Sequence, residues 1–279
     1  MSNLLLFLSP CPNDTFMLDA WLNKQADTFD LPVKFSFYDI KTLNELSANC
    51  IADITKLSVL TAANVLNNYQ ILTSGAAIGY ENGPLVVSKK KIYPDEIPYL
   101  KIAVPGINTT AFALLKIFYN KLYSIKEYFF YEIEDVILDN EADAGLIIHE
   151  SRFTYQQKGL KLVIDLGKLW HQKFNLPLPL GIFAVKRTLD INTKLKINEL
   201  IKESILFAFK NPHISYKFVI ENAQVKDTQV ITNHISLYVN DYSVNMGEIG
   251  KKSIYTFFEE ANKIDLINNN FKTQSVFVS

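Results

Sequence analysis

The first half of the chain contains one segment twice, and this internal repeat limits the fold more than any other feature of the sequence. The first copy runs from LLLFLSPCPNDTFMLDAWL to NELSANCIADITKLS, and the second from KIAVPGINTTAFALLKIF to DVILDNEADAGLIIHE. Each copy starts with a short apolar strand, passes through a polar loop that contains proline, and enters a helix. A second helix, an Ala-Asp step and another apolar strand follow. The repeat therefore predicts two similar α/β lobes.

Each copy starts a helix directly after its first strand, at residues 13–15 and 108–110. Short polar side chains cap helices by accepting hydrogen bonds from first-turn N–H groups. A helix N-terminus at the end of a strand is also a common place for a ligand in α/β proteins. The alternative interpretation is that these residues only cap the helices and contact no ligand. The ligand contacts expected on these grounds are Asn13, Asp14, Thr109 and Thr110.

The charge of the chain points to a small-molecule partner. Its 279 residues include 28 Lys and Arg against 29 Asp and Glu, so the formal net charge is -1. Such a balance gives no electrostatic reason to expect nucleic acid or an anionic membrane as a partner. The chain is long enough to bury one or two sizeable cores, since 48% of its residues are hydrophobic.

The cysteines and the N-terminal residues suggest a reducing, cytoplasmic setting. Cys11 and Cys50 form no CxxC pair and have no histidine cluster beside them, so we expect neither a disulfide framework nor a zinc site. The apolar run at 4–8 is short and no Lys or Arg precedes it, so we expect a buried strand and not a signal peptide. The sequence contains no run of eighteen uncharged apolar residues, so we expect no transmembrane helix.

The pattern of elements predicts how the chain divides between the lobes. We expect residues 1–88 and 182–279 to form a larger α/β lobe with C-terminal helices, and residues 89–181 to form a smaller α/β lobe. The chain then crosses between the lobes twice, which makes a hinge, and loops from both halves line a cleft. This is the type II periplasmic-binding-protein architecture.

His149 is the sharpest candidate for chemistry. It ends the apolar run AGLII and is followed by polar residues, so it lies where a strand leaves the core at the mouth of the expected cleft. An imidazole there has a pKa near neutrality and is suited to accept a proton. A histidine that only caps or hydrogen-bonds the chain is the alternative. The other histidines, His171, His213 and His234, are expected to be structural or solvated.

Lys56, Leu57 and Ser58 end the strand of the first copy that corresponds to the strand before His149. Ser58 can hydrogen-bond a ligand, and Lys56 can either attract a carboxylate or simply be exposed. A covalent role for Cys11 is conceivable because its thiol lies near a helix start, but packing is the simpler expectation. The sequence contains no Ser-His-Asp arrangement, phosphate loop, metal-spaced carboxylates or cofactor motif. Acid–base chemistry on a bound small molecule, without metal or cofactor, is therefore the simplest enzymatic interpretation.

Seven motifs, which follow one another over nearly the whole chain, resemble the 1,4-dihydroxy-6-naphthoate synthase family. They are SPCPNDTF, ADITKLS, GPLVVS, PGINTTA, ADAGLIIHESRFTY, LPLPLG and HISLYVNDY. The first and fifth motifs are specific, and the others are weak alone.

The resemblance implies a fold, an activity and a set of site residues. The family has the two-lobed binding-protein fold and belongs to the futalosine route to menaquinone. It converts cyclic dehypoxanthinylfutalosine to 1,4-dihydroxy-6-naphthoate with loss of the sugar-derived fragment. Its catalytic base is a histidine in the IIHE motif, which is His149 here. Its substrate contacts fall on a strand-end Lys-x-Ser and a helix-start Thr-Thr, which match residues 56–58 and 109–110.

Three other functions stay open at this point. Chorismate dehydratase has the same fold and acts earlier in the same pathway. A solute-binding protein would capture a small aromatic carboxylate without chemistry, and a ligand-sensing domain would normally be joined to a DNA-binding helix-turn-helix. The sequence does not choose a general acid, for which Asp14 and Glu150 are both candidates.

Overall fold

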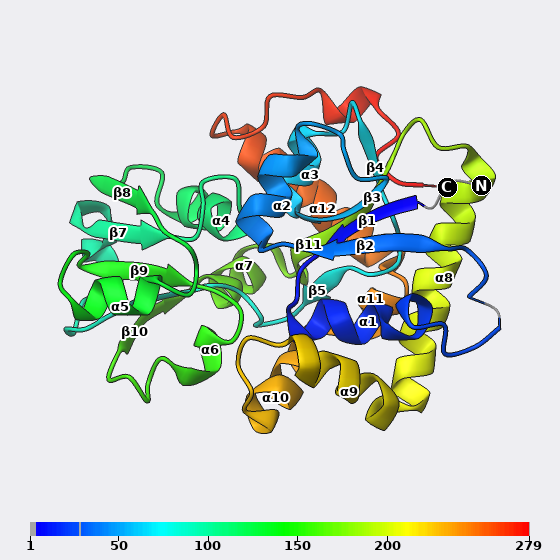
Figure 1. Ribbon diagram of the computed structural model, residues 1–279. Coiled ribbons are helices and arrows are strands. Elements are labelled where there is room, and N and C mark those ends of the chain that lie inside the picture. The colour runs from blue at the N-terminus through cyan, green and yellow to red at the C-terminus, as the bar shows by residue number, and fades with distance from the viewer. Residues whose placement is uncertain (1–3, 28, 279) are drawn as a thin grey trace.

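The larger of two lobes is built on a six-stranded sheet (Figure 1). The computed structural model describes residues 4–27 and 29–278. The strands of this sheet are β1 (Leu4–Leu8), β2 (Val33–Phe37), β3 (Ile54–Ser58), β4 (Tyr69–Ile71), β5 (Ala77–Gly79) and β11 (Leu178–Lys186). Their order is β2-β1-β3-β11-β4, and β5 pairs with β11 beside this path. β1 runs parallel to β2 and β3, whereas β11 is antiparallel to β3.

The smaller lobe is built on a five-stranded sheet, which Figure 1 shows in green tones on the left. Its strands are β6 (Leu85–Ser88), β7 (Lys101–Val104), β8 (Ser124–Glu127), β9 (Ala144–Ile147) and β10 (Lys161–Asp165). Their order is β10-β6-β9-β7-β8. β7 is parallel to β8 and β9, and β6 is antiparallel to β9.

The internal repeat of the sequence is also a repeat of topology. The helices of the two copies are α1 (Pro12–Leu22) and α2 (Ile40–Ser47) in the first, and α4 (Thr110–Phe118) and α5 (Ile133–Leu138) in the second. The first copy gives the strand order β2-β1-β3, and the second gives the matching order β8-β7-β9. In both lobes an antiparallel strand from outside the copy, β11 or β6, pairs with the third strand of the copy. Each repeat is therefore one α/β unit of the same design.

The repeated Ala-Asp step has the same structural role in both lobes. A carboxylate oxygen of Asp53 accepts a hydrogen bond from the backbone N–H of Leu5 at 2.9 Å. A carboxylate oxygen of Asp143 likewise accepts from the backbone N–H of Lys101 at 2.9 Å. In each case the aspartate satisfies a donor at the start of the first strand, which would otherwise lack a ladder partner. The step is thus structural and lies away from the carboxyl ends of the strands.

Both lobe boundaries differ from the expected ones. We expected residues 1–88 in the larger lobe, but β6 pairs with β9 and β10 of the smaller sheet. The first crossing therefore precedes Leu85, and the return strand β11 begins at Leu178, a few residues before the expected 182. A short apolar strand shows by its sequence that it is buried, but not which sheet it joins. Residues 1–3, 28 and 279 of the expected larger lobe lie outside the described residues.

The remaining helices cover both sheets. They are α3 (Val59–Asn64), α6 (Ser151–Thr154), α7 (Leu166–Phe174), α8 (Ile191–Lys210), α9 (Pro212–Asn222), α10 (Thr228–Tyr238), α11 (Asp241–Val244) and α12 (Gly247–Asn262), with 3-10 turns at Pro94–Tyr99 and Phe271–Thr273. α8, α9 and α10 pack around α1 in the larger lobe, and α10 extends toward the smaller lobe (Figure 1). Within residues 4–27 and 29–278, no helix has the length and apolar character needed to cross a bilayer.

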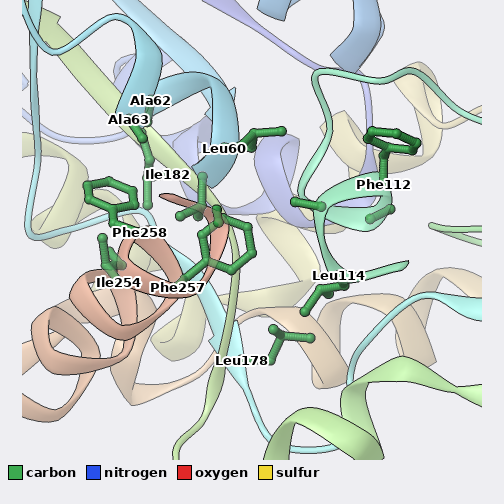
Figure 2. Packing of buried hydrophobic residues seen from close by; sticks show 14 of the residues in the cluster. Leu60, Ala62, Ala63, Phe112, Leu114, Leu178, Ile182, Ile254, Phe257 and Phe258 are labelled. Atoms are coloured by element: carbon green, nitrogen blue, oxygen red, sulfur yellow. The ribbon is translucent and has the colours of Figure 1, made fainter. Parts of the chain in front are cut away.

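A single apolar cluster joins the two lobes. Figure 2 shows Phe257 and Phe258 of α12 packed with Ile182 of β11, Leu60 of α3 and Leu114 of α4. The cluster includes buried residues of both sheets, because α3 of the larger lobe lies against α4 of the smaller lobe. Burying a side chain of this size contributes roughly 1.5–3 kcal/mol. The lobes are therefore held together by shared packing as well as by the two chain crossings.

Candidate active site

A cleft between the lobes brings together most of the residues that the sequence singled out. Its volume is about 680 Å³, including the part open to solvent. The predicted base and all predicted ligand contacts except Leu57 line it, whereas Glu150, one of the two candidate general acids, is not among the lining residues. The lining residues are Ser9, Asn13, Asp14, Ile40, Lys56, Ser58, Ala77, Asn82, Gly83, Pro84, Thr109, Thr110, Ala111, Ile148, His149, Leu180, Gly181, His234 and Tyr238. Segments far apart in the sequence thus meet where strands of both sheets end, as expected for this type of fold.

The floor of the cleft holds a buried ion pair. Nζ of Lys56 lies 2.7 Å from Oδ1 of Asp14, and the two side chains are 5% and 2% exposed. The carboxylate also accepts hydrogen bonds from the hydroxyl of Ser9 at 2.7 Å and from the amide of Asn13 at 2.8 Å. The Lys56 ammonium lies 4.7 Å from the ring centroid of Phe183. The charge of Lys56 is therefore neutralised within the protein and does not face the cleft as a free cation.

The start of α1 differs from the expected one. We expected Asn13 or Asp14 to cap this helix, but Cys11 occupies the N-cap position and makes no side-chain capping bond. Pro12 takes the first helical position, where its missing N–H costs nothing. Asn13 and Asp14 therefore lie inside the first turn, and their side chains are free to build the polar network of the cleft.

The alternation of side chains along β3 separates the three predicted residues at its end. Lys56 and Ser58 line the cleft, whereas Leu57 is fully buried in the apolar cluster. Successive side chains of a strand point to opposite faces, so all three could not reach one ligand. Asn44 fixes Ser58 by donating to its hydroxyl oxygen and by accepting from its backbone N–H, both at 3.0 Å. The Ser58 hydroxyl keeps its own proton available for a ligand.

The two threonines at the start of α4 have their hydroxyl groups occupied by the protein. The hydroxyl of Thr109 caps the helix by accepting from the N–H of Phe112 at 3.1 Å, and it donates to the carbonyl of Gly106. The hydroxyl of Thr110 donates to the carbonyl of Leu180 and accepts from the N–H of Val59 at 2.9 Å. What this helix start offers to a ligand is therefore its backbone N–H groups and the positive end of its dipole.

His149 follows β9 and lies in the cleft wall with a left-handed backbone, at a φ of 56°. Its Nδ1 is 3.6 Å from the sulfur of Cys11, which belongs to the other lobe. Its ring packs edge-to-face against Phe130 at a centroid distance of 4.8 Å. Its Nε2 is buried and has no hydrogen-bond partner in the described part of the chain. A positive φ is uncommon for histidine and recurs at functional sites.

The electrostatics of the cleft keep His149 neutral and Cys11 protonated. Burial lowers the pKa of His149 to about 4, and the nearby charge of Lys56 acts in the same direction, against the opposing charge of Asp14. The imidazole is therefore unprotonated near neutral pH and able to accept a proton. Burial, with the charges of Glu150 and Asp14, raises the pKa of the Cys11 thiol well above its usual value. A thiolate nucleophile at Cys11 does not fit this environment.

Sequence reasoning assigned His234 a structural or solvated role, but the structure places it in the cleft wall. It is 1% exposed, and its Nε2 lies 2.9 Å from the side-chain oxygen of Asn13. Its ring lies 6.3 Å from that of His149 and nearly parallel to it. Tyr238, one helical turn further along α10, lines the same wall. The two residues are four positions apart, which places both side chains on one face of the helix.

The first crossing between the lobes forms one edge of the cleft and is closely packed. Asn82, Gly83 and Pro84 line the cleft there. Arg152 of the smaller lobe donates to the carbonyl oxygens of Glu81 and Gly83, and it pairs with Asp165 at 2.7 Å. A Cβ on Gly83 would lie 2.3 Å from the backbone nitrogen of Gly167, so no other residue fits without movement of the chain. The crossing is therefore held by the smaller lobe.

The other histidines lie outside the cleft. His171 of α7 packs against Tyr80 near the crossing, and His213 is exposed at the start of α9. In residues 4–27 and 29–278, no group of three or more His, Cys, Asp or Glu side chains is placed to hold a metal ion.

The sequence matches a family of known pathway. A family model described as "Menaquinone biosynthesis" matches residues 6–263. The chain is 36% identical over 261 residues to a Thermus thermophilus protein, with 94% of each chain covered. It is 33% identical over 254 residues to a Streptomyces coelicolor protein, with 88% of each chain covered. Both relatives are named 1,4-dihydroxy-6-naphthoate synthase.

Solved structures confirm the fold. The structure is similar to the crystal structure of an Archaeoglobus fulgidus protein at a TM-score of 0.90 and 34% identity, covering 95% of this chain and 98% of the other. It also matches the periplasmic aliphatic sulphonate binding protein of Escherichia coli at a TM-score of 0.63 and 9% identity, covering 98% and 100% of the two chains. The periplasmic-binding-protein-like fold predicted from the sequence is thus confirmed.

Proposed function

Because the chain belongs to the menaquinone-biosynthesis family of 1,4-dihydroxy-6-naphthoate synthases, which are lyases, we propose that it converts cyclic dehypoxanthinylfutalosine to 1,4-dihydroxy-6-naphthoate. The reaction removes the sugar-derived fragment and leaves an aromatic product. It belongs to the futalosine route to menaquinone. A cytoplasmic setting is part of this proposal, and the two free cysteines are compatible with it.

The observation that carries the proposal is a neutral imidazole at the wall of a cleft of suitable size. His149 lines the cleft, and burial lowers its pKa to about 4. It can therefore remove a proton from the bicyclic substrate near neutral pH, and the resulting electron pair drives elimination toward the aromatic product. The ring is held between Cys11 and Phe130, so the base is oriented before the substrate arrives.

The polar groups that remain available in the cleft suit an anionic, oxygen-rich ligand. The hydroxyl of Ser58 can donate a hydrogen bond, since its bonds with Asn44 use only its oxygen lone pairs. The backbone N–H groups of Thr110 and Ala111 lie in the first turn of α4, at the positive end of the helix dipole. We assign the substrate carboxylate to these three donors.

Asp14 and Lys56 support the site, but neither charged group contacts the substrate. Their charges neutralise each other at 2.7 Å. The Asp14 carboxylate also orients the amides and hydroxyls around it, including the side chain of Asn13. Closure of the lobes over the substrate would exclude water from reactive intermediates.

The test is turnover by the purified protein. We expect cyclic dehypoxanthinylfutalosine to give the naphthoate, followed by absorbance and mass, and we expect no product from chorismate. His149→Gln should lower kcat by at least about a hundredfold, the scale of a lost general base. His213→Gln, at an exposed histidine outside the cleft, is the matched control and should retain wild-type kcat. Tight binding of the substrate without turnover would instead indicate a binding protein, and conversion of chorismate would indicate the dehydratase.

A further inference from the structure

Two buried titratable side chains beside His149 have no part in the mechanism described above. Glu150 follows His149 in the smaller lobe, and His234 lies on α10 of the larger lobe. They are 5% and 1% exposed. Nδ1 of His234 lies 3.9 Å from Oε1 of Glu150. The pair therefore bridges the two lobes directly behind the proposed base.

The hydrogen-bond network of the cleft fixes the tautomer of His234. The Asp14 carboxylate pairs with Lys56 and can only accept hydrogen bonds, so the amide nitrogen of Asn13 must face it. The side-chain oxygen of Asn13 then faces His234 at 2.9 Å from Nε2. Because that oxygen is an acceptor, Nε2 must carry the imidazole proton. The lone pair of the neutral ring is consequently on Nδ1.

This Nδ1 lone pair lacks a donor. Nδ1 of His234 is buried and has no hydrogen-bond partner among residues 4–27 and 29–278. A buried acceptor without a donor costs about 1–3 kcal/mol. Across the lobe boundary, the carboxyl group of Glu150 lies 3.9 Å from it. An ionised carboxylate there would place two acceptors face to face, whereas a protonated carboxyl group can donate to Nδ1 after an approach of about 1 Å.

We propose that protonated Glu150 donates a hydrogen bond to Nδ1 of His234, and that this bond between the lobes positions His149 for catalysis. Glu150 and His234 are positioning residues in this arrangement, because neither donates a proton to the substrate or accepts one from it. The inference rests on the proposed function only for the identity of the base. The proposed bond does not involve the substrate, so it can be tested in the unliganded protein.

Burial favours the protonated form of Glu150 below about pH 6, because it raises the pKa of this carboxyl group to about 6. The titratable groups around it are the neutral His149, the thiol of Cys11 just before α1, and His234 and the phenol of Tyr238 on α10. The pKa values of these groups do not favour charge at neutral pH. The guanidinium group of Arg152 is bound to Asp165 and to backbone carbonyl oxygens.

The geometry shows how the pair would act on the base. The His149 ring lies nearly parallel to that of His234 at 6.3 Å, and its Nδ1 contacts Cys11 of the larger lobe at 3.6 Å. Both contacts depend on the segment around 148–151 staying close to α1 and α10. A bond from Glu150, the next residue in the chain, ties this segment to α10. The proposed bond would hold this segment, and with it the ring of His149, against α10.

The first test needs no substrate. In the unliganded protein, imidazole ¹⁵N NMR should show the proton of His234 on Nε2, and its Nδ1 shift should change from hydrogen-bonded to free as pH rises through about 6. Glu150→Gln carries an amide that donates at every pH, so the Nδ1 shift should then stay constant. Glu141→Gln, at an exposed glutamate of the same lobe, should behave as the wild type. A proton on Nδ1, or a wild-type shift that does not change between about pH 5 and 8, would overturn the proposal.

The second test is kinetic. Wild-type kcat/KM should fall by up to about tenfold per pH unit above the pKa of Glu150, and Glu150→Gln should lack this fall. Glu150→Ala should lower kcat below the pKa of Glu150, with KM changed much less, and should approach the wild type above that pKa. An alkaline fall that persists in Glu150→Gln would refute the positioning role. If the NMR result is as expected but the wild type turns over no substrate, the pair stands and the proposed function fails.

Discussion

The ion pair between Lys56 and Asp14 should be among the most sensitive sites for stability. The two charges are 2.7 Å apart, and their side chains are 5% and 2% exposed. Lys56→Met leaves the carboxylate buried with only the donors of Ser9 and Asn13. Removing one partner of a buried pair typically costs about 3–5 kcal/mol, because the other charge is left uncompensated. We expect a loss of that size for Lys56→Met.

The double variant separates pairing from packing. Asp14→Asn should also destabilise, because the Lys56 ammonium then keeps only the carbonyl of Gly75 at 3.4 Å and the ring of Phe183. Lys56→Met with Asp14→Asn removes both charges, so its loss should be smaller than the sum of the single losses by at least about 2 kcal/mol.

Urea unfolding, followed by tryptophan fluorescence, measures these free energies, provided that the m-value is unchanged. The matched control is the exposed pair of Lys202 and Glu199, which is 2.8 Å apart with side chains 34% and 51% exposed. Lys202→Met should change the free energy of unfolding by less than about 1 kcal/mol. Single losses below about 1 kcal/mol at Lys56 and Asp14, or strictly additive losses, would refute the reasoning.

Three further outcomes follow from the structure. Since burial lowers the pKa of His149 from 6.5 to about 4, the folded state takes up this proton at lower pH than the unfolded state. The stability that neutral His149 contributes is therefore present above about pH 6.5 and is lost as pH falls toward 4. Over that range, the free energy of unfolding of the wild type should fall relative to that of His149→Gln by up to about 3 kcal/mol. Gly83→Ala should destabilise more than Gly159→Ala in urea unfolding, because a Cβ at Gly83 meets backbone at 2.3 Å, whereas Gly159 has open space and only a positive φ; equal losses would contradict this. A thiol reagent should label the partly exposed Cys50 quickly in the native protein and Cys11 only after unfolding, which mass spectrometry of timed samples can check, and rapid native labelling of Cys11 would contradict its buried, protonated state.

The sequence was sufficient for the parts of the fold that depend on local pattern. The repeat predicted two similar lobes because both copies carry the same succession of strand, loop and helix, and the strand orders of the two sheets match. The pattern did not show that β6 belongs to the smaller sheet, since its pairing with β9 depends on residues about sixty positions away.

The site was predictable where a motif lies at a strand or helix end. His149, Ser58 and the start of α4 line the cleft as expected. Leu57 was wrongly grouped with its neighbours, because a strand turns alternate side chains away from one another. His234 was missed because its helical periodicity looks ordinary, and its partner Asn13 is 221 residues away. Such long-range polar contacts leave no local signal.

The central claim is that His149 is the general base, and chemical rescue tests it most directly. His149→Ala should lose at least about a hundredfold in kcat on cyclic dehypoxanthinylfutalosine. Added imidazole should restore part of the rate, in proportion to the concentration of its neutral form. Turnover by His149→Ala at the wild-type rate, or a lost rate that imidazole does not raise at any pH in a folded variant, would contradict the account.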